Sequence, residues 1–445
     1  MTRPVGDLTA HRLHRLVAQE QVRARMPSLV AGVVRDGALM WSGSHGEYTG
    51  GPAPSTDLQY RIGSITKTMT GVSVMQLRDE GLLDLGDRLE QHLPGARYGD
   101  ATIRSLMSHS AGLPSEPPGT WWERSPGVAF DDLAAAVADS PAPLPPGHQF
   151  HYSNLAWALL GEVVARLRGG SWWEQLEHRV LRPLGMGRTS YLPQPPAATG
   201  YSVTPFADTL TEEPATDTAA MAPAGQVWST IDDLSRYVAF LLGGADDVLA
   251  RSTLEEMAIP QSGSQATGLA VGHGLGMQLV SAGSGTLVGH GGSMPGFLAG
   301  LYVDRVRQTG AMTLANGTSS MRNLPVALLE TLEELEPASP PAWVPVDSVS
   351  DPVAEVLGVW HWGNTGFTFG YTGGEIVVAA LRGGAVAYKF RLREDGTFVG
   401  TEGYHLGEVL HVVRDPDGGI SHLECATFVY TRTPYDPHAP IPGGS

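Results

Sequence analysis

Ser64 and Lys67 stand three residues apart at the start of a segment, residues 64–82, whose apolar positions recur at helical spacing. Residues three apart on a helix share a face, so a serine hydroxyl and a lysine amine can be neighbours there. An apolar core behind the helix start would lower the pKa of the lysine by desolvation. A neutral lysine beside a serine is a base and nucleophile pair for acyl transfer. The spacing alone does not decide, because a capping serine followed by a surface lysine gives the same pattern.

The use of lysine elsewhere in the chain bears on this pair. The sequence has 27 arginines and only two lysines, Lys67 and Lys389. Lysine readily loses its proton and can act as a base, whereas arginine does not. Lys389 lies in the alternating stretch AVAYKFRL, where we expect it to face water. Lys67 is therefore the lysine that we expect to have a chemical role.

Two later patterns could complete an acyl-transfer site. Tyr152 and Asn154 lie between a Pro-Gly turn and a helix-like run; a tyrosine can relay a proton, and an asparagine can orient a lysine and a substrate amide. His290, followed by Gly291 and Gly292, ends a strand-like run where a substrate backbone could approach closely. Each pattern also has an ordinary structural explanation, and His-x-Gly occurs elsewhere in the chain. The three patterns follow one another along the chain, and each lies at the boundary of a predicted element. We therefore treat them as parts of one site.

The elements that would position these residues alternate between short strand-like runs and longer helical ones. Strand-like runs lie at both ends of a long helical middle, which favours a mixed sheet packed against a helical region. The clearest segments are two helical ones, 64–82 and 155–169, and three strand-like ones, 285–290, 299–305 and 310–316.

A proline-rich stretch divides the chain. Four prolines between residues 337 and 345 predict a stiff linker. Beyond it, short alternating runs separated by glycine turns predict a small antiparallel barrel or sandwich. We therefore expect four parts: a catalytic domain over 1–336, the linker over 337–345, a β domain over 346–437 and a disordered tail over 438–445.

Composition narrows the class of protein. The chain has 445 residues and a net charge of -17, which argues against a nucleic-acid partner. No apolar run approaches the roughly 18 residues of a membrane span, and the N-terminal stretch lacks the apolar core of a secretory signal. We therefore expect a cytoplasmic protein without a membrane partner. The single cysteine, Cys425, excludes an internal disulfide and a multi-cysteine metal site, and we expect it to be buried and inert. We expect neither a metal site nor a cofactor.

With neighbouring stretches such as RIGSITK, LMSHSAGLP, PPGHQFHYSNLAWALLGEVV and GHGGSMPGF, the sequence resembles the serine β-lactamase and penicillin-binding-protein superfamily, especially its class C-like esterase and peptidase branch. The order Ser-x-x-Lys, Tyr-x-Asn, Lys/His-x-Gly is that of the family, and the resemblance covers most of residues 25–320. It implies an α/β (α+β) transpeptidase-like domain, with an antiparallel sheet and a helical subdomain. The β domain resembles the lipocalin-like barrel attached to several members that are not β-lactamases.

The resemblance also implies roles. Ser64 would be the acylated nucleophile and Lys67 its base. Tyr152 would relay the proton, Asn154 would hold Lys67 and the substrate amide, and His290 would orient the substrate and Tyr152. His290 stands where antibiotic-destroying members carry lysine, which lowers the expectation of efficient β-lactam hydrolysis.

Further contacts with the substrate are expected, and the resemblance implies the first of them. The backbone N–H groups of Ser64 and Ser293 would form the oxyanion hole. Gly291 and Gly292 would let the substrate backbone lie close to the strand. Trp121 and Trp122, between the first two motifs, are either core or rim aromatics or line the substrate cleft.

The members that carry a lipocalin-like domain include D-amino-acid-specific peptidases and stand-alone penicillin-binding-protein-type thioesterases, which cyclise nonribosomal peptides. We therefore expect an acyl-enzyme acting on peptide esters, thioesters or amides with a preference for D-residues, and specifically head-to-tail macrocyclisation. Within the enzyme class, the alternatives are a D-stereospecific aminopeptidase or carboxypeptidase and a class C-like carboxylesterase. A catalytically inactive peptide-binding or sensor module is the alternative of another class. It would keep its function in a Ser64→Ala variant.

The expected partner is a peptide substrate, either free or presented on a peptidyl carrier protein. Carrier proteins are usually acidic, so the net charge of -17 counts against the second form. Cyclisation requires that an amine outcompete water, so the site must be shielded and the peptide folded back. We expect the β domain to supply that cover.

Overall fold

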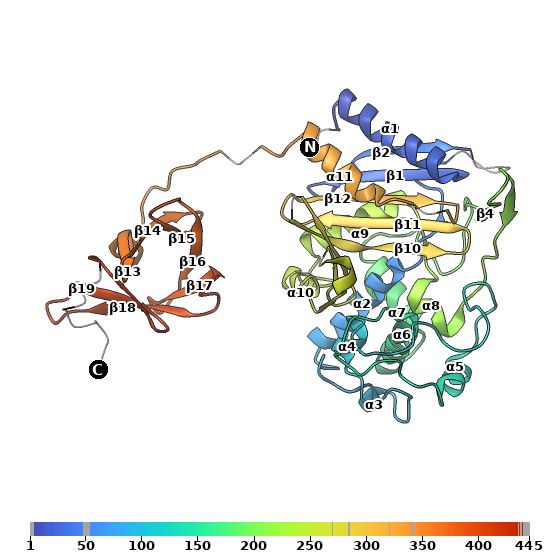
Figure 1. Cartoon of the computed structure of the whole chain (residues 1–445), viewed down its shortest axis with the longest axis horizontal. Helices are drawn as coiled ribbons and strands as arrows, with labels where there is room; N and C mark the ends of the chain where they lie inside the picture. The colour runs from blue at the N-terminus through green and yellow to red at the C-terminus, as the bar shows by residue number, and fades with distance from the viewer. Residues whose placement is uncertain are drawn as a thin grey trace. The chain divides into compact units, whose positions relative to one another are not determined.

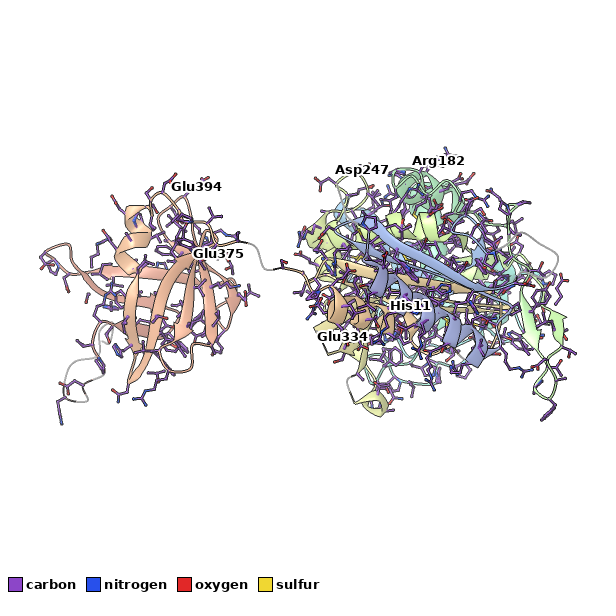
Figure 2. The ribbon with its side chains drawn as sticks, turned by 90° about the horizontal axis from the view of Figure 1, so that it is seen from above. His11, Arg182, Asp247, Glu334, Glu375 and Glu394 are labelled. Carbon is purple, nitrogen blue, oxygen red and sulfur yellow. The ribbon has the colours of Figure 1, made fainter. Side chains whose placement is uncertain are left out.

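The computed structural model describes residues 4–47, 54–268, 270–283, 285–319, 321–339 and 342–434, together with 436 and 438. The chain divides into two compact units, Met1–Ser339 and Pro340–Ser445. Charged side chains such as Arg182 in the first unit and Glu394 in the second lie exposed at the surface (Figure 2).

An antiparallel sheet forms the centre of the first unit (Figure 1). Its strand order is β2-β1-β12-β11-β10-β9-β8-β7. The expected mixed sheet is wrong, because every neighbouring pair is antiparallel. Short turns join β10, β11 and β12, and such turns connect antiparallel neighbours. The strands are β1 (Ser28–Arg35), β2 (Ala38–Gly46), β7 (Ser262–Gly263), β8 (Val271–His273), β9 (Gln278–Ala282), β10 (Gly285–Met294), β11 (Phe297–Asp304) and β12 (Thr309–Ala315).

Helices cover both faces of this sheet. α1 (Asp7–Ala24) and α11 (Leu324–Leu335) share one apolar cluster with Leu29 of β1. α9 (Ile231–Gly243) belongs to another cluster, which includes the next residue of β1, Val30. Successive side chains of a strand point to opposite faces, so these two clusters lie on the two sides of the sheet.

A helical region lies between β2 and β7 in the sequence and packs around α2 (Ile65–Asp79) (Figure 1). Nearly every residue of α2 is buried, and α6 and α8 both contact it. The other helical elements of this region are α3 (Leu89–His92), α4 (Ile103–Met107), α5 (Phe130–Val137), α6 (Asn154–Arg168), α7 (Trp172–Leu176), the π-helical turn η1 (Glu177–Leu181), η2 (Ala219–Met221), α8 (Ala222–Gly225) and α10 (Arg251–Met257). A short turn, η3 (Gln265–Thr267), follows β7. Two short ribbons pair β3 (Tyr60–Arg61) with β6 (Trp228–Ser229), and β4 (Tyr201–Val203) with β5 (Leu210–Glu212).

The second unit is a closed barrel of eight antiparallel strands, preceded by α12 (Asp351–Val356). Its interior holds a separate apolar cluster that includes Trp360, Phe390 and Tyr430, all fully buried. The strands are β13 (Gly358–Trp362), β14 (Thr365–Thr372), β15 (Glu375–Ala380), β16 (Val386–Leu392), β17 (Phe398–Gly403), β18 (Val409–Arg414), β19 (Ile420–Cys425) and β20 (Phe428–Thr431). The predicted fold class, an antiparallel sheet with helices and a C-terminal barrel, is confirmed.

Two further expectations concern the ends and the linker. The described residues of the linker, 337–339 and 342–345, form neither helix nor strand. The expected disordered tail lies outside the described residues, apart from His438. Among the helices described, none has both the length and the apolar character that crossing a membrane requires.

Candidate active site

Ser64 and Lys67 meet at the start of α2. Ser64 is the N-cap residue, and the Nζ of Lys67 donates to its Oγ at 2.8 Å. The same Nζ donates to the carbonyl oxygen of Ala224 at 2.6 Å. Lys67 is fully buried. The spacing of Ser64 and Lys67 alone was also compatible with a lysine exposed at the surface. These contacts leave Nζ directed at a serine hydroxyl from within the core.

The surroundings of Lys67 control its charge. Burial lowers the pKa of Lys67 to about 7, because the charged form loses its hydration, and the carboxylates of Glu116 and Glu123 oppose this effect. A lysine with a pKa near neutrality is an effective proton acceptor at physiological pH. The arrangement therefore provides a nucleophile with its own base.

Tyr152 completes this group. Its ring centroid lies 5.2 Å from the Nζ of Lys67, and its hydroxyl is hydrogen-bonded to Ser64. Burial raises the pKa of the Tyr152 phenol above its usual range, and the hydrogen bond to Ser64 opposes that shift. Tyr152 thus remains a neutral hydroxyl that can both accept and donate a proton beside the nucleophile.

A loop after α4 fixes Tyr152 in place. The imidazole of His109 stacks on the Tyr152 ring, with centroids 4.2 Å apart and planes 23° apart. His109 has a positive φ of 56°, and its Nδ1 accepts a hydrogen bond of 3.0 Å from the backbone N–H of Ser153. The Ser153 hydroxyl in turn donates to the carbonyl of Pro114 and accepts from the N–H of Ala156. Through the second bond, Ser153 caps the N-terminus of α6. The LMSHSAGLP stretch is therefore the support of the tyrosine motif.

Asn154 lies at the site but has a different partner from the expected one. Its Nδ2 donates to Oε1 of Glu116 at 2.6 Å, whereas Nζ of Lys67 is held by Ala224 and Ser64. Trp122 donates from its indole to the other oxygen of Glu116 at 2.7 Å. Burial raises the pKa of Glu116, and these two hydrogen bonds oppose the rise. Asn154 therefore acts on Lys67 through a carboxylate and makes no hydrogen bond to it.

His290 lies on β10 at the edge of the same group. Its ring centroid is 6.1 Å from that of Tyr152, and its Nδ1 is 2.5 Å from the carbonyl oxygen of Gly291. Burial lowers the pKa of His290 to about 3, with a further decrease from the charge of Lys67. Within the described part of the chain, its Nε2 is buried and has no hydrogen-bond partner. His290 is thus a neutral group with one nitrogen available to a ligand.

The segment after His290 runs directly beside the nucleophile. A Cβ on Gly292 would lie 2.0 Å from the carbonyl oxygen of Ile62, so a larger residue does not fit there. A Cβ on Gly63 would lie 2.5 Å from the backbone nitrogen of Ser293. The backbone of Gly63, the residue before Ser64, is therefore in contact with the backbone of Ser293. Two N–H donors of one oxyanion hole would need this proximity. Gly291 is less confined, since the nearest atom to a Cβ there is the Tyr302 hydroxyl at 3.9 Å.

The two tryptophans differ in their contacts. Trp122 is buried, at 8% exposure, and reaches the site through Glu116. Trp121 is 60% exposed, donates to the Glu123 carboxylate at 2.8 Å and is covered by the guanidinium of Arg124 at 4.6 Å.

Sequence reasoning missed Glu116, Ala224 and His273. His273, at the end of β8, is 6.3 Å from His290 and 5.3 Å from His109 between ring centroids. Burial lowers the pKa of His273 to about 4, and among the described residues both of its ring nitrogens are buried without a partner. A backbone carbonyl such as that of Ala224 carries no sequence signal, and neither Glu116 nor His273 belongs to a motif with diagnostic spacing.

Comparisons with known proteins place this chain in a family. Residues 13–335 match the family "Beta-lactamase", and residues 349–432 match "Domain of unknown function (DUF7586)". The D-alanyl-D-alanine-carboxypeptidase/endopeptidase AmpH of Escherichia coli K12 is 32% identical over 222 residues, which are 46% of this chain and 55% of AmpH. This chain spans about half the length of the curated relatives that it matches first, 46% and 55%.

Solved structures of two proteins illustrate the likeness, each at more than 25% sequence identity. SurE, also solved with D-Leu, is 27% identical with a TM-score of 0.61, and the match covers 96% of this chain and 99% of SurE. A D-stereospecific amidohydrolase from Streptomyces is 26% identical with a TM-score of 0.61, covering 74% of this chain and 98% of that one. The predicted β-lactamase and penicillin-binding-protein superfamily is confirmed. The chain belongs to the Beta-lactamase family and has the fold of its serine hydrolases.

Proposed function

We propose that this protein forms an acyl-enzyme on Ser64 with peptide esters, thioesters or amides, prefers a D-residue at the acyl position, and closes linear peptides head to tail. The observation that carries the chemistry is the contact of 2.8 Å between Ser64 and a buried Lys67 whose pKa is lowered to about 7. A catalytically inactive binding module would have no need of a neutral lysine beside a serine.

Acylation uses the three polar groups in turn. Neutral Lys67 accepts the hydroxyl proton of Ser64 as Oγ forms its bond to the substrate carbonyl carbon. The bond from that carbon to the leaving group then breaks, and Tyr152 gives its proton to the leaving group and recovers one from Lys67. The backbone N–H groups of Ser64 and Ser293 stabilise the negative oxygen in between, where each donor is worth about 3 kcal/mol.

Deacylation reverses the order with a new nucleophile. An amine or a water loses its proton through Tyr152 as it attacks the acyl carbon, and Ser64 leaves as a hydroxyl. Water gives hydrolysis, whereas the amine at the other end of the same peptide gives a ring. Holding that amine in place supplies effective concentration that water at an open site lacks.

The charges around the site support a substrate with a free amine. The carboxylates of Glu116 and Glu123 are close enough to act on Lys67. The imidazoles of His290 and His273 have pKa values of about 3 and 4, so both are neutral near pH 7. A negative region attracts an ammonium group and repels a carboxylate. A free N-terminal amine fits this site better than the free C-terminal carboxylate of a carboxypeptidase substrate.

The preference for D-residues is supported by the two structural neighbours above. One was solved with D-Leu and the other is described as D-stereospecific. The match to SurE extends over 96% of the chain, whereas that to the amidohydrolase covers 74%. Cyclisation rests on the resemblance of the motifs and the attached β domain to stand-alone penicillin-binding-protein-type thioesterases. The substrate would be free or carried by a peptidyl carrier protein, in the cytoplasm.

A D-aminoacyl amidase is the second candidate. The same acidic pair that would hold the N-terminus of a long peptide would equally hold the α-amino group of a single D-residue amide. The match to a D-stereospecific amidohydrolase favours this reading.

Mass spectrometry of three substrates separates these activities. The full chain is incubated with a linear peptidyl thioester ending in a D-residue, with its L-ended twin and with a D-residue amide. Loss of thiol without gain of water, for the D-thioester alone, supports the cyclase, and release of ammonia from the amide supports the amidase. Turnover retained by Ser64→Ala would overturn the acyl-enzyme itself.

A further inference from the structure

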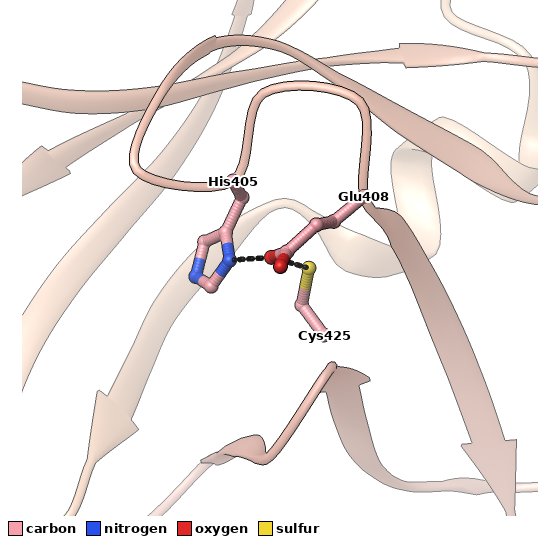
Figure 3. A group of neighbouring side chains, drawn as sticks. All are labelled: His405, Glu408 and Cys425. Carbon is pink, nitrogen blue, oxygen red and sulfur yellow. Dashed lines mark hydrogen bonds and ion pairs between the residues drawn. The ribbon is translucent and has the colours of Figure 1, made fainter.

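Three side chains of types that can bind a metal ion meet in the barrel of the second unit. They are His405, Glu408 and Cys425, here called the barrel cluster, and their ligand atoms all lie within 4.8 Å of one another. Figure 3 shows the Glu408 carboxylate between the imidazole and the thiol. The Oε2 of Glu408 is 2.6 Å from Nδ1 of His405 and 3.8 Å from Sγ of Cys425.

The three side chains differ in their access to solvent. The side chains of His405 and Cys425 are fully buried, whereas that of Glu408 is 42% exposed. The cluster therefore has one side in the core and one side open to water. A small ion could enter beside Glu408 without unfolding the barrel.

Backbone geometry fixes the pair from the loop between β17 and β18. The N–H of Glu408 donates to the carbonyl of His405 at 3.0 Å, so the two side chains leave a single turn. A Cβ on Gly400 would lie 1.8 Å from that same His405 carbonyl, and Gly403 has a φ of 85°. Two glycines are thus needed for the loop to lie this close to the sheet.

The second ring nitrogen of His405 also has a hydrogen-bond partner. Its Nε2 lies 3.2 Å from the hydroxyl of Tyr430, which is itself buried. A histidine that binds a metal usually uses one nitrogen for the ion and the other for a hydrogen bond that fixes its orientation. Tyr430 gives His405 this arrangement, with Nδ1 directed at the cluster.

We propose that the barrel cluster binds one Zn²⁺ ion through Nδ1 of His405, the Glu408 carboxylate and the Cys425 thiolate, with water in the fourth position. Imidazole nitrogen, carboxylate oxygen and thiolate sulfur are each ligands that zinc takes in proteins. Binding releases the thiol proton to solvent, and the two anionic ligands then balance the charge of the dication. The buried group is therefore neutral as a whole, which suits an apolar interior. The inference is independent of the function proposed for Ser64.

A single cysteine excludes only a metal site with several cysteines. The expectation of no metal site and of an inert Cys425 changes under this proposal, although Cys425 is buried as expected. The separation of 17 residues between Glu408 and Cys425 hides the cluster from a motif search.

Zinc content and affinity of the full-length chain test the proposal. The protein is treated with a chelator, reloaded with zinc, desalted and analysed for metal, and its affinity is measured against a chromogenic chelator. Co²⁺ replaces zinc in a parallel sample, because a thiolate ligand gives a charge-transfer absorption band in the near ultraviolet. We expect one zinc per chain and that band.

Cys425→Ser and Glu408→Gln are the informative variants, since both keep the size of the side chain. We expect each to weaken zinc binding by about 100-fold or more, and Cys425→Ser to abolish the Co²⁺ band. The matched control is Glu424→Gln, because Glu424 pairs with His422 at 2.8 Å on the same barrel without a thiol. Less than one zinc per ten wild-type chains, or equal binding by wild type and both variants, would overturn the proposal.

Discussion

The amide of Asn154 is hydrogen-bonded to the carboxylate of Glu116 at 2.6 Å, and that carboxylate raises the pKa of Lys67. Asn154 thus influences Lys67, the proposed base, indirectly, by orienting a negative charge. Trp122 holds the same carboxylate from the other side. A network of three side chains, Glu116 with Asn154 and Trp122 bonded to it, therefore places this negative charge near Lys67.

Replacing Glu116 with glutamine removes this charge and keeps an acceptor for Asn154. The pKa of Lys67 then falls further below its usual value, so the acid limb of the pH profile of kcat/KM moves down by roughly half a unit. Stopped-flow hydrolysis of a chromogenic ester between pH 5 and 9 measures the shift. The control is Glu162→Gln, because Glu162 lies on α6 and pairs with Arg166. If the acid limb of the kcat/KM profile stays at the same pH or moves up in Glu116→Gln, the network is contradicted.

The wild-type profile itself follows from Lys67. Because its folded pKa is lowered to about 7, Lys67 is protonated and inactive as a base below that pH, and kcat/KM rises as the pH passes through about 7. Lys67→Arg cannot lose a proton, so we expect a loss of about 1000-fold or more at every pH. Lys389→Arg in the barrel should leave the rate unchanged. Comparable activity in Lys67→Arg would exclude lysine as the base.

Tyr152→Phe tests the proton relay. The ring and its stacking on His109 remain, whereas the hydroxyl bonded to Ser64 is lost. We expect kcat to fall by about 100- to 10,000-fold without loss of folding. Rapid-quench mass spectrometry of the acyl-enzyme separates the two half-reactions. Tyr98→Phe, which removes a hydroxyl bonded to Ser140, is the matched control, and equal rates in the two variants would contradict the relay.

His290→Lys introduces a positive charge where the neutral imidazole now lies. The charge of Lys67 already lowers the pKa of His290, so the two positions are close enough to interact, and a protonated lysine at position 290 should lower the pKa of Lys67 and shift the acid limb of the profile down. The same cation should attract a substrate carboxylate. We expect faster acylation by benzylpenicillin, measured as the increase in intact mass of the protein. Slower acylation by benzylpenicillin, together with an acid limb of the pH profile that does not move, would show that His290 has another role.

Deletion of residues 346–445 tests the cover expected of the β domain. If the barrel shields the acyl-enzyme, the truncated protein should release linear acid in place of ring, or lose turnover. Liquid chromatography with mass detection gives the ratio of the two products, and labelling of Ser64 by a fluorophosphonate shows that the first unit remains folded. An unchanged ratio in labelled protein would contradict the shielding role.

Local sequence was sufficient for the features that depend on neighbours along the chain. Ser64 and Lys67 are three apart on one helix, so their contact follows from helical geometry. The proline-rich linker and the alternating runs beyond it predicted a separate antiparallel barrel or sandwich, because strand alternation and glycine turns are local patterns. The order of the three motifs was enough to suggest the family.

Only the tertiary structure decided which groups act on these residues. The carbonyl that holds Lys67 belongs to Ala224, 157 residues away, and the partner of Asn154 is Glu116, 38 residues before it. The pKa of Lys67 depends on complete burial, and so do the neutral states of His290 and His273. Desolvation and contacts across long loops have no fixed spacing in a sequence. They arise only when the sheet, α2 and the loop supporting Tyr152 pack together.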